Sequence, residues 1–432
     1  MSEPEHPRRL PPAERNSPKD WYAVAAIVLA IAVVIAVCVF TAPVQRVEST
    51  VASNPLSANE TGRAPSSDGP RALTETWSTP DPSQPLTVGK GGVLVRKDDH
   101  TVVMLRAATG EQVWRYRAAD PICSSASNGG YTLVVTRSAK GCGEVVSLNT
   151  EDGSYHATRA ALASDKVAIQ SSNDNVGTVS STRVELWRDD LVRTVEVGKV
   201  EAPAQAGKQL HPACQIGSAL WRKDLLAVMQ RCEEANVDVE ADQHDGDKGY
   251  VRLMKTVPED SSEPEDHTSW TLPYDAVLVA VSQDRALVYV PTGPDTAEFQ
   301  VLNKDGEADK VQTFVAPYST LAHNASAGFS PETADLPENM TWWDGQRLIG
   351  FNPASLAPTW TVEGALGTGA AMSDRLLVPV RDGIAVVNWS TGKTERVIPV
   401  DRGGAEGPVK LAVQGRYVIE QRSTGTTVLE AS

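Results

Sequence analysis

The tripeptide Gly392-Lys393-Thr394 has the residue types that close a phosphate-binding loop. Such a loop also needs a glycine five positions before Gly392 and a helix after the lysine and threonine, because glycine backbone and a helix N-terminus hold the phosphate. Val387 occupies the glycine position, and residues 395–400 (ERVIPV) alternate like a strand. The spacing therefore argues against nucleotide binding, and Gly392 needs another explanation.

Residues that could carry hydrolytic or metal chemistry are scattered. Residues 324–328 (NASAG) lack the first glycine of a nucleophile elbow. Residues 238–249 offer many carboxylates but no EF-hand frame, so we expect a solvated loop. Two carboxylates from distant strands, as in a glycosidase, stay open because sequence spacing does not test them. The seven histidines form no HExxH or other short ligand pair and lie at positions 6, 100, 156, 211, 244, 267 and 323.

Trp342 and Trp343 form the candidate binding surface of the chain, because indoles stack on sugars and lipid headgroups. Adjacent residues of a strand face opposite sides. One tryptophan should therefore pack between blades while the other meets solvent, and core packing is favoured over a binding role.

Four cysteines form two pairs of similar spacing, Cys123 with Cys142 and Cys214 with Cys232. Each pair brackets a strand-like run, so we expect bridges between neighbouring strands, although four cysteines permit three pairings. Neither pair has the C-x-x-C spacing of a zinc site, and no histidine is expected beside them. The pattern predicts disulfides and an oxidising compartment.

An apolar segment near the N-terminus, residues 21–42, contains no charge. At about 1.5 Å per residue it spans about 33 Å, enough to cross a membrane. Basic residues at 8, 9, 15 and 19 precede it, which predicts a cytoplasmic tail (1–20) and an exported remainder. A cleaved signal peptide is the alternative, but its apolar region would be shorter.

Residues 43–72 are rich in serine, proline and asparagine and predict a flexible linker. The net charge of −15 argues against a nucleic-acid partner. Much of this charge lies in an acidic insertion at about 233–266. A domain of residues 73–432 remains.

That domain contains a repeat that explains Gly392. An apolar residue is followed five positions later by glycine, as in Leu105 to Gly110 and Val387 to Gly392, and then by a second strand. Two copies have leucine in place of this glycine, at Leu191 and Leu356. Each copy predicts a strand, a tight turn and a strand, with glycine supplying the positive φ of the turn.

A turn followed by another apolar-rich strand precedes each copy. The repeating unit therefore contains four strands, which predicts an all-β propeller. Eight outer strands can be counted, so we expect eight blades, with seven as the alternative. Residues 408–430 supply three strands without a fourth, and residues 75–80 (ETWSTP) supply a fourth strand alone. Pairing these two segments would close the ring and remove exposed sheet edges.

The G-x-x-x-W ending of residues 110–116 (GEQVWRY), with weaker matches at 356–360 and 392–397, resembles the repeat of quinoprotein-type (PQQ-like) propellers. The chain as a whole resembles single-anchor, exported PQQ-like propeller proteins of actinobacterial envelopes, a family whose function is largely unassigned. The resemblance also implies one enzymatic alternative, a dehydrogenase that holds a quinone and calcium. The chain lacks the adjacent cysteine pair and the longer tryptophan-docking repeats of many such enzymes, so we expect no cofactor and no metal.

The expected function is that of a non-enzymatic scaffold or binding module, anchored in the cell membrane with its propeller outside. Its expected partner is an envelope protein or a cell-wall or lipid precursor. A quinone-dependent dehydrogenase or a carbohydrate-active propeller enzyme is the alternative.

Overall fold

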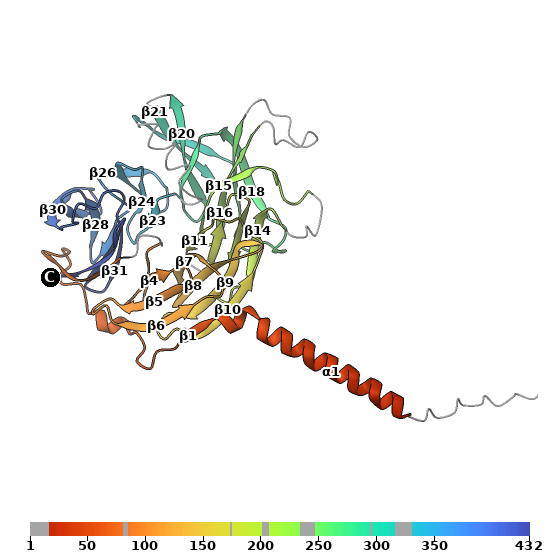
Figure 1. Cartoon of the computed structure of the whole chain (residues 1–432). Helices are drawn as coiled ribbons and strands as arrows, with labels where there is room; N and C mark the ends of the chain where they lie inside the picture. The colour runs from red at the N-terminus through yellow and green to blue at the C-terminus, as the bar shows by residue number, and fades with distance from the viewer. Residues whose placement is uncertain are drawn as a thin grey trace, which may run out of the picture. The chain divides into compact units, whose positions relative to one another are not determined.

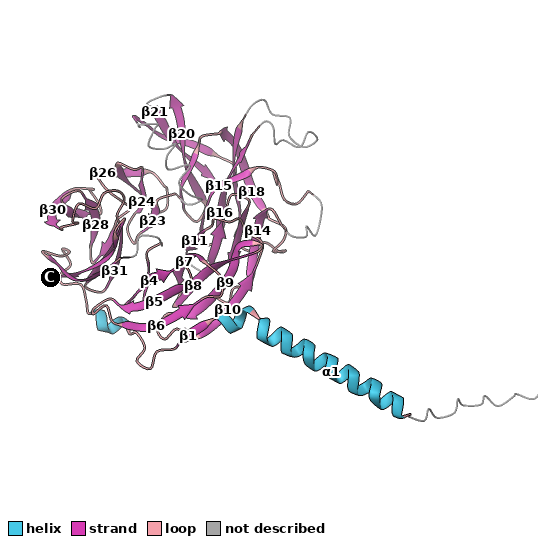
Figure 2. Ribbon diagram, in the orientation of Figure 1, coloured by secondary structure: helices cyan, strands magenta, loops and turns pink. Residues whose placement is uncertain are grey.

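The computed structural model describes residues 17–80, 85–172, 175–200, 207–233, 247–293, 296–315 and 331–432. The chain divides into two compact units, Met1–Glu48 and Ser49–Ser432. The first unit contains helix α1 (Pro18–Thr41) and the short helix η1 (Pro43–Arg46). The second unit is built almost entirely of strands (Figure 2).

Helix α1 begins slightly before the predicted segment because the chain supplies helix-starting residues there. The backbone N–H of Ser17 donates to a carboxylate oxygen of Asp20 at 2.6 Å, and Pro18 occupies the first turn, where its missing N–H costs nothing. The helix is strongly apolar after its first turn and buries none of its residues. By length and composition it can cross a membrane.

The strands form eight antiparallel sheets, so the prediction of eight blades is confirmed (Figure 1). Blade 1 contains β3 (Thr87–Gly89), β4 (Gly92–Asp98), β5 (Thr101–Arg106) and β6 (Gln112–Arg117), with β1 (Glu48–Thr50) beside β6. Blade 2 contains β7 (Ile122–Asn128), β8 (Tyr131–Ser138), β9 (Gly141–Asn149) and β10 (Tyr155–Ala160). Blade 3 contains β11 (Ala168–Ser172), β12 (Asn175–Val179), β13 (Arg183–Trp187) and β14 (Arg193–Gly198). Blade 4 contains β15 (Gln215–Arg222), β16 (Leu225–Cys232), β17 (Lys248–Lys255) and β18 (Asp266–Pro273).

The remaining blades follow in chain order, except that the last one uses both ends of the domain. Blade 5 contains β19 (Val277–Val281), β20 (Arg285–Gly293), β21 (Thr296–Asn303) and β22 (Ala308–Val315). Blade 6 contains β23 (Thr333–Asp335), β24 (Met340–Trp343), β25 (Arg347–Phe351) and β26 (Pro358–Glu363). Blade 7 contains β27 (Ala370–Met372), β28 (Arg375–Val380), β29 (Gly383–Asn388) and β30 (Thr394–Pro399). Blade 8 contains β31 (Lys410–Gln414), β32 (Tyr417–Arg422), β33 (Gly425–Ala431) and β2 (Leu73–Thr79).

Blade 8 closes the ring as the sequence predicts. Strand β2 pairs with β33 in antiparallel register, with Trp77 opposite Val428 and Ser78 opposite Thr427. The first and last strands of the propeller are therefore neighbours in one sheet. This pairing satisfies an edge that would otherwise be exposed.

The acidic insertion accompanies the four strands predicted for blade 4, which are all present among the described residues. It lies between β16 and β17 and between β17 and β18, which pair in the predicted order. Residues 234–246, the most acidic part, lie outside the described residues, as do residues 324–328.

The hydrophobic core is divided into layers between neighbouring blades. One cluster joins blades 5 and 6 around Phe299 and Trp342, and another joins blades 6 and 7 around Trp343 and Val387. The first strands of successive blades contact one another, as in β7 with β11 and β27 with β31, so they line the centre of the ring. Both faces of a blade are consequently buried, which explains continuous buried runs such as β19.

The linker prediction for residues 43–72 is wrong for residues 49–72, which pack on the propeller. Leu56 is 3% exposed, and its backbone N–H donates to the carbonyl of Glu151 at 2.8 Å. Arg106 donates to the carbonyl of Asn54 at 2.7 Å and forms an ion pair with Glu60. A polar composition conceals such docking, because a single buried leucine and a few backbone hydrogen bonds suffice for it.

Candidate functional site

The turn at Gly392 belongs to blade 7 and joins β29 to β30. Gly392 has φ of 67°, and its N–H donates to the carbonyl of Asn388 at 2.9 Å. A strand follows where a phosphate-binding loop requires a helix. The turn interpretation is therefore confirmed.

The same turn has a packing role that the sequence did not reveal. An indole from the outer strand of one blade lies against the turn glycine of the next blade, so that a Cβ added to Gly153 would be 2.7 Å from Trp114. The indole N–H also donates to the carbonyl three residues before that glycine. These hydrogen bonds are Trp77 to Ala107 (2.8 Å), Trp114 to Thr150 (2.9 Å) and Trp360 to Trp389 (2.7 Å).

At the interface between blades 2 and 3 the sizes of the two residues are exchanged, with a small residue on the outer strand and a large one in the turn. Ala157 occupies the register position of Trp114, and Leu191 occupies the turn position of Gly153. Leu191 is 2% exposed and keeps a positive φ of 62°, and Ala157 packs against the cluster that contains it. A large turn residue thus fills the space that a missing indole leaves.

Trp342 and Trp343, the candidate binding surface, are both buried, so core packing is confirmed and the expectation that one of them meets solvent is wrong. Trp342 is 1% exposed and packs against Tyr289 and Phe299 of blade 5. Trp343 is 9% exposed, packs toward blade 7, and donates from Nε1 to the carbonyl of Ala365 at 2.8 Å. The two residues do face opposite sides of the strand, but a neighbouring blade covers each side.

Both predicted disulfides are present, Cys123–Cys142 and Cys214–Cys232. The second joins Cys214, directly before β15, to Cys232 at the end of β16, and these strands are neighbours in blade 4. The first joins β7 to β9, and β8 lies between them in the sheet, so the expectation of neighbouring strands holds for one bridge only. Cys38 on α1 is free and exposed.

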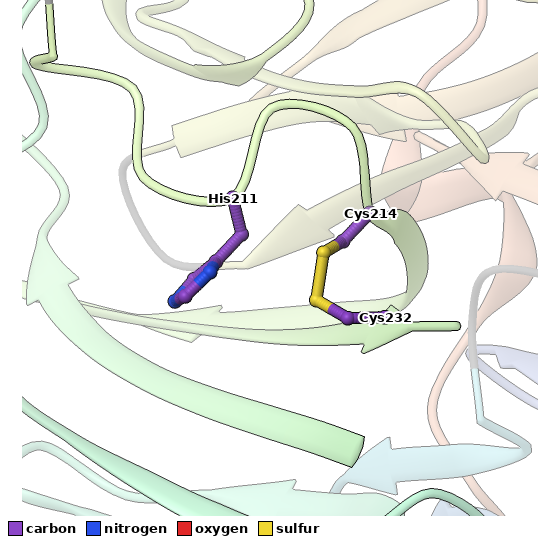
Figure 3. Close-up of side chains that lie close together, drawn as sticks. All are labelled: His211, Cys214 and Cys232. Carbon is purple, nitrogen blue, oxygen red and sulfur yellow. A yellow bond between two sulfur atoms is a disulfide. The ribbon is translucent and has the colours of Figure 1, made fainter. Parts of the chain in front are cut away.

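A histidine lies beside the second disulfide, contrary to the expectation from the sequence. The ligand atoms of His211, Cys214 and Cys232 lie within 4.8 Å of one another (Figure 3). The His-x-x-Cys spacing at 211–214 was the available signal, since a single tight turn can bring such residues together. Three other described histidines, at 100, 156 and 267, belong to no such group among the residues that the structure describes.

A cavity of about 220 Å³ lies where the inner parts of blades 3 to 6 meet. Its apolar lining includes Leu220 and Met340, and its polar lining includes Gln170, Arg222 and Asp335. The sequence singled out none of these residues, because they come from four blades and share no motif. Their proximity follows only from closure of the ring.

An ion pair crosses this cavity. Arg222 Nε lies 3.1 Å from a carboxylate oxygen of Asp335, and another guanidinium nitrogen donates to the carbonyl of Pro353 at 3.1 Å. Burial raises the pKa of the Asp335 carboxyl, and the Arg222 charge partly opposes this effect. The Gln170 side-chain N–H₂ group is buried and has no hydrogen-bond partner in the part of the chain that the structure describes.

The described cavity does not fit a quinone with calcium. Of its lining residues, only Asp335 carries a carboxylate, and that carboxylate is paired with Arg222. Calcium takes six to eight oxygen ligands, usually with several carboxylates. The disulfides also join cysteines 19 and 18 residues apart rather than adjacent cysteines.

No family model matches the chain, and no curated protein is similar to it. Similar solved structures include BamB from Moraxella catarrhalis, 13% identical, covering 84% of this chain and 100% of that chain, with a TM-score of 0.43. Quinohemoprotein alcohol dehydrogenase ADHIIG from Pseudomonas putida HK5 is 12% identical, with coverage of 84% and 74% and a TM-score of 0.48. Sqt1 from Saccharomyces cerevisiae is 9% identical, with coverage of 89% and 100% and a TM-score of 0.47. These likenesses concern the fold alone, and the number of blades is established by the sheets themselves.

Proposed function

We propose that this chain is a non-enzymatic binding module, anchored in the cytoplasmic membrane, whose propeller binds an envelope protein on the outer side. The observation that carries the proposal is the central cavity, where the amide of Gln170 and the Arg222–Asp335 ion pair lie among apolar side chains. Pockets that combine an apolar lining with a few fixed polar groups are typical binding sites.

The chemistry of the cavity favours recognition over catalysis. The Asp335 carboxylate is already paired with a guanidinium, and no second carboxylate is among the described lining residues to act with it as an acid–base pair. An amide and an ion pair can instead bind a backbone and a charged side chain of a protein segment. Leu220 and Met340 supply apolar contact beside them.

The proposed location rests on α1 and the disulfides. Helix α1 contains the uncharged apolar segment that begins at Trp21, and Arg8, Arg9, Arg15 and Lys19 precede that segment. Basic residues on the short side of a span favour retention of that side in the cytoplasm. Disulfides persist in oxidising compartments, which agrees with export of the propeller.

Two reporter fusions test this topology. A reporter that is active only outside the cytoplasm should work after Ser432 and fail before Trp21. The reverse result would overturn the proposed location.

Chemical crosslinking in intact cells tests binding. The wild-type chain should capture a defined envelope protein, and an Arg222→Ala, Asp335→Ala double variant should lose it while keeping its melting temperature. Equal capture by both chains would remove the cavity from the proposal. Stoichiometric binding of added quinone in the presence of calcium would favour the dehydrogenase instead.

A further inference from the structure

The cluster of His211, Cys214 and Cys232 has the donor atoms of a soft-metal site. Two sulfurs and an imidazole lie side by side, with ligand atoms within 4.8 Å of one another, where β15 begins and β16 ends (Figure 3). Cys232 is 1% exposed, and the other two residues are half-buried. In the oxidised chain the sulfurs are bonded to each other, so they are poor metal ligands, because thiolates bind metal.

Backbone contacts hold the histidine in place independently of the sulfurs. The N–H of Cys214 donates to the carbonyl of His211 at 3.0 Å, and Gln230 Nε2 donates to the same carbonyl at 3.1 Å. The ring of His211 stacks on Tyr250 of β17, with centroids 4.2 Å apart and planes 18° from parallel. His211 has a φ of 51°, a conformation that is uncommon for residues other than glycine and is often found at functional sites.

A buried acceptor lies next to this group. Gln230 is 0% exposed, and its side-chain oxygen accepts no hydrogen bond from the described residues. Gln230 and Cys232 are two positions apart on β16, so they project from the same face of the strand. An unsatisfied buried oxygen destabilises the fold, and a metal-bound water could satisfy it.

We propose that reduction of Cys214–Cys232 converts this cluster into a zinc site with two thiolates and the imidazole of His211 as ligands. A dithiol reductant supplies two electrons and two protons, which yields two thiols here and a disulfide in the reductant. Zinc then displaces the two thiol protons and binds both sulfurs. Water takes the fourth position of the tetrahedral ion, beside Gln230.

The required movement is small. Two sulfurs that each lie about 2.3 Å from a tetrahedral ion are about 3.8 Å apart. The three ligand atoms already lie within 4.8 Å, so side-chain rotations can open the sulfurs around an ion. Thiolate and imidazole are the ligands that zinc prefers.

The other disulfide provides an internal control. Cys123 and Cys142 belong to no such group in the part of the chain that the structure describes. Blade 2 does contain a stacked histidine, His156, whose ring lies 3.9 Å from that of Tyr131. The two blades thus share a disulfide and a histidine–tyrosine stack, but only blade 4 brings histidine and sulfurs together.

Metal titration of the full-length chain in detergent tests the proposal. The Cys123→Ser, Cys142→Ser variant retains only the blade 4 pair, and a phosphine reduces it without adding thiols. Cobalt(II) should give thiolate charge-transfer absorption and bind one ion per reduced chain, zinc should displace it, and the oxidised chain should bind none. His211→Ala should weaken binding at least tenfold, and His156→Ala should leave it unchanged.

Several results would overturn the proposal. The proposal is wrong if the reduced variant binds no metal or if His211→Ala binds it as tightly. It is also wrong if the mirror variant Cys214→Ser, Cys232→Ser binds metal equally well. Wild-type protein with both disulfides reduced should bind one ion rather than two, which provides the test if the serine variants do not fold. If reduction unfolds the chain and zinc does not restore its circular dichroism, the proposal is also wrong.

Discussion

The indole of Trp360 lies directly against Gly392 of the next blade, and its Nε1 donates to the carbonyl of Trp389 at 2.7 Å. A turn residue with a side chain would displace the ring. The glycine is therefore required twice, once for its positive φ and once for the space that the indole occupies. Equivalent contacts at Trp77 and Trp114 make this a recurring link between blades.

Gly392→Ala should destabilise the propeller by about 2–4 kcal/mol, because strain at positive φ adds to displacement of the indole. An added Cβ would lie 2.4 Å from the Cβ of Trp360. Gly403→Ala is the matched control, since Gly403 has φ of 57° and no atom within 4 Å of an added Cβ. It should cost only about 1–2 kcal/mol. Equal losses in urea unfolding would contradict the indole contact.

Leu191→Gly should cost about 1–4 kcal/mol, because the lost burial outweighs the relief of a positive φ. Ala157→Trp alone should also destabilise, by overpacking against Leu191. Together the two changes recreate the pairing of Trp114 with Gly153, and the double variant should be more stable than the sum of the single losses predicts. A double-mutant cycle measures this coupling. Strictly additive losses would show that the two positions do not share one space.

Leu56→Ala should lower stability by about 2–4 kcal/mol, since Leu56 is buried although it lies outside every blade strand. Val51→Ala is the control, because Val51 is 60% exposed and should change stability by less than about 0.5 kcal/mol. Deletion of residues 49–70 should lower the melting temperature further. An unchanged melting temperature would restore the flexible-linker interpretation.

The local repeat was sufficient to predict the blades. An apolar residue, a turn at the fifth position and a second strand are all encoded within about a dozen residues, so the frame is visible even where Leu191 replaces glycine. The two disulfide pairings also follow from local spacing. These features depend on short-range geometry alone.

The predictions that were wrong required knowledge of what covers each surface. The alternation at Trp342 and Trp343 is correct, but a propeller places a neighbouring blade on both sides. Leu56 lies in a polar segment, and only the shape of the propeller surface gives it a site. Arg222 and Asp335 come from different blades, and neither has a local signature that indicates the other.

Asp335 should make stability depend on pH. Because burial raises its pKa, the folded chain binds this proton more tightly than the unfolded chain does. The stability that comes from the protonated Asp335 carboxyl is complete below the unfolded pKa of about 3.9. It is lost as the pH rises through the higher pKa of the folded chain. Wild type should therefore lose stability relative to Asp335→Asn as the pH rises from about 4, measured by urea unfolding. A difference that is constant with pH, or that changes in the opposite direction, would show that burial does not dominate.

Site-specific photocrosslinking in intact cells tests the central claim most directly, which is that the propeller binds an envelope protein through its central cavity. A photoreactive phenylalanine analogue replaces Gln170 in the cavity or, as a control, Tyr155, which is 64% exposed on outer strand β10. The account predicts one defined protein adduct from position 170, its loss when Arg222→Ala is added, and no such adduct from position 155. No adduct from position 170, or the same adducts from both positions, would contradict it.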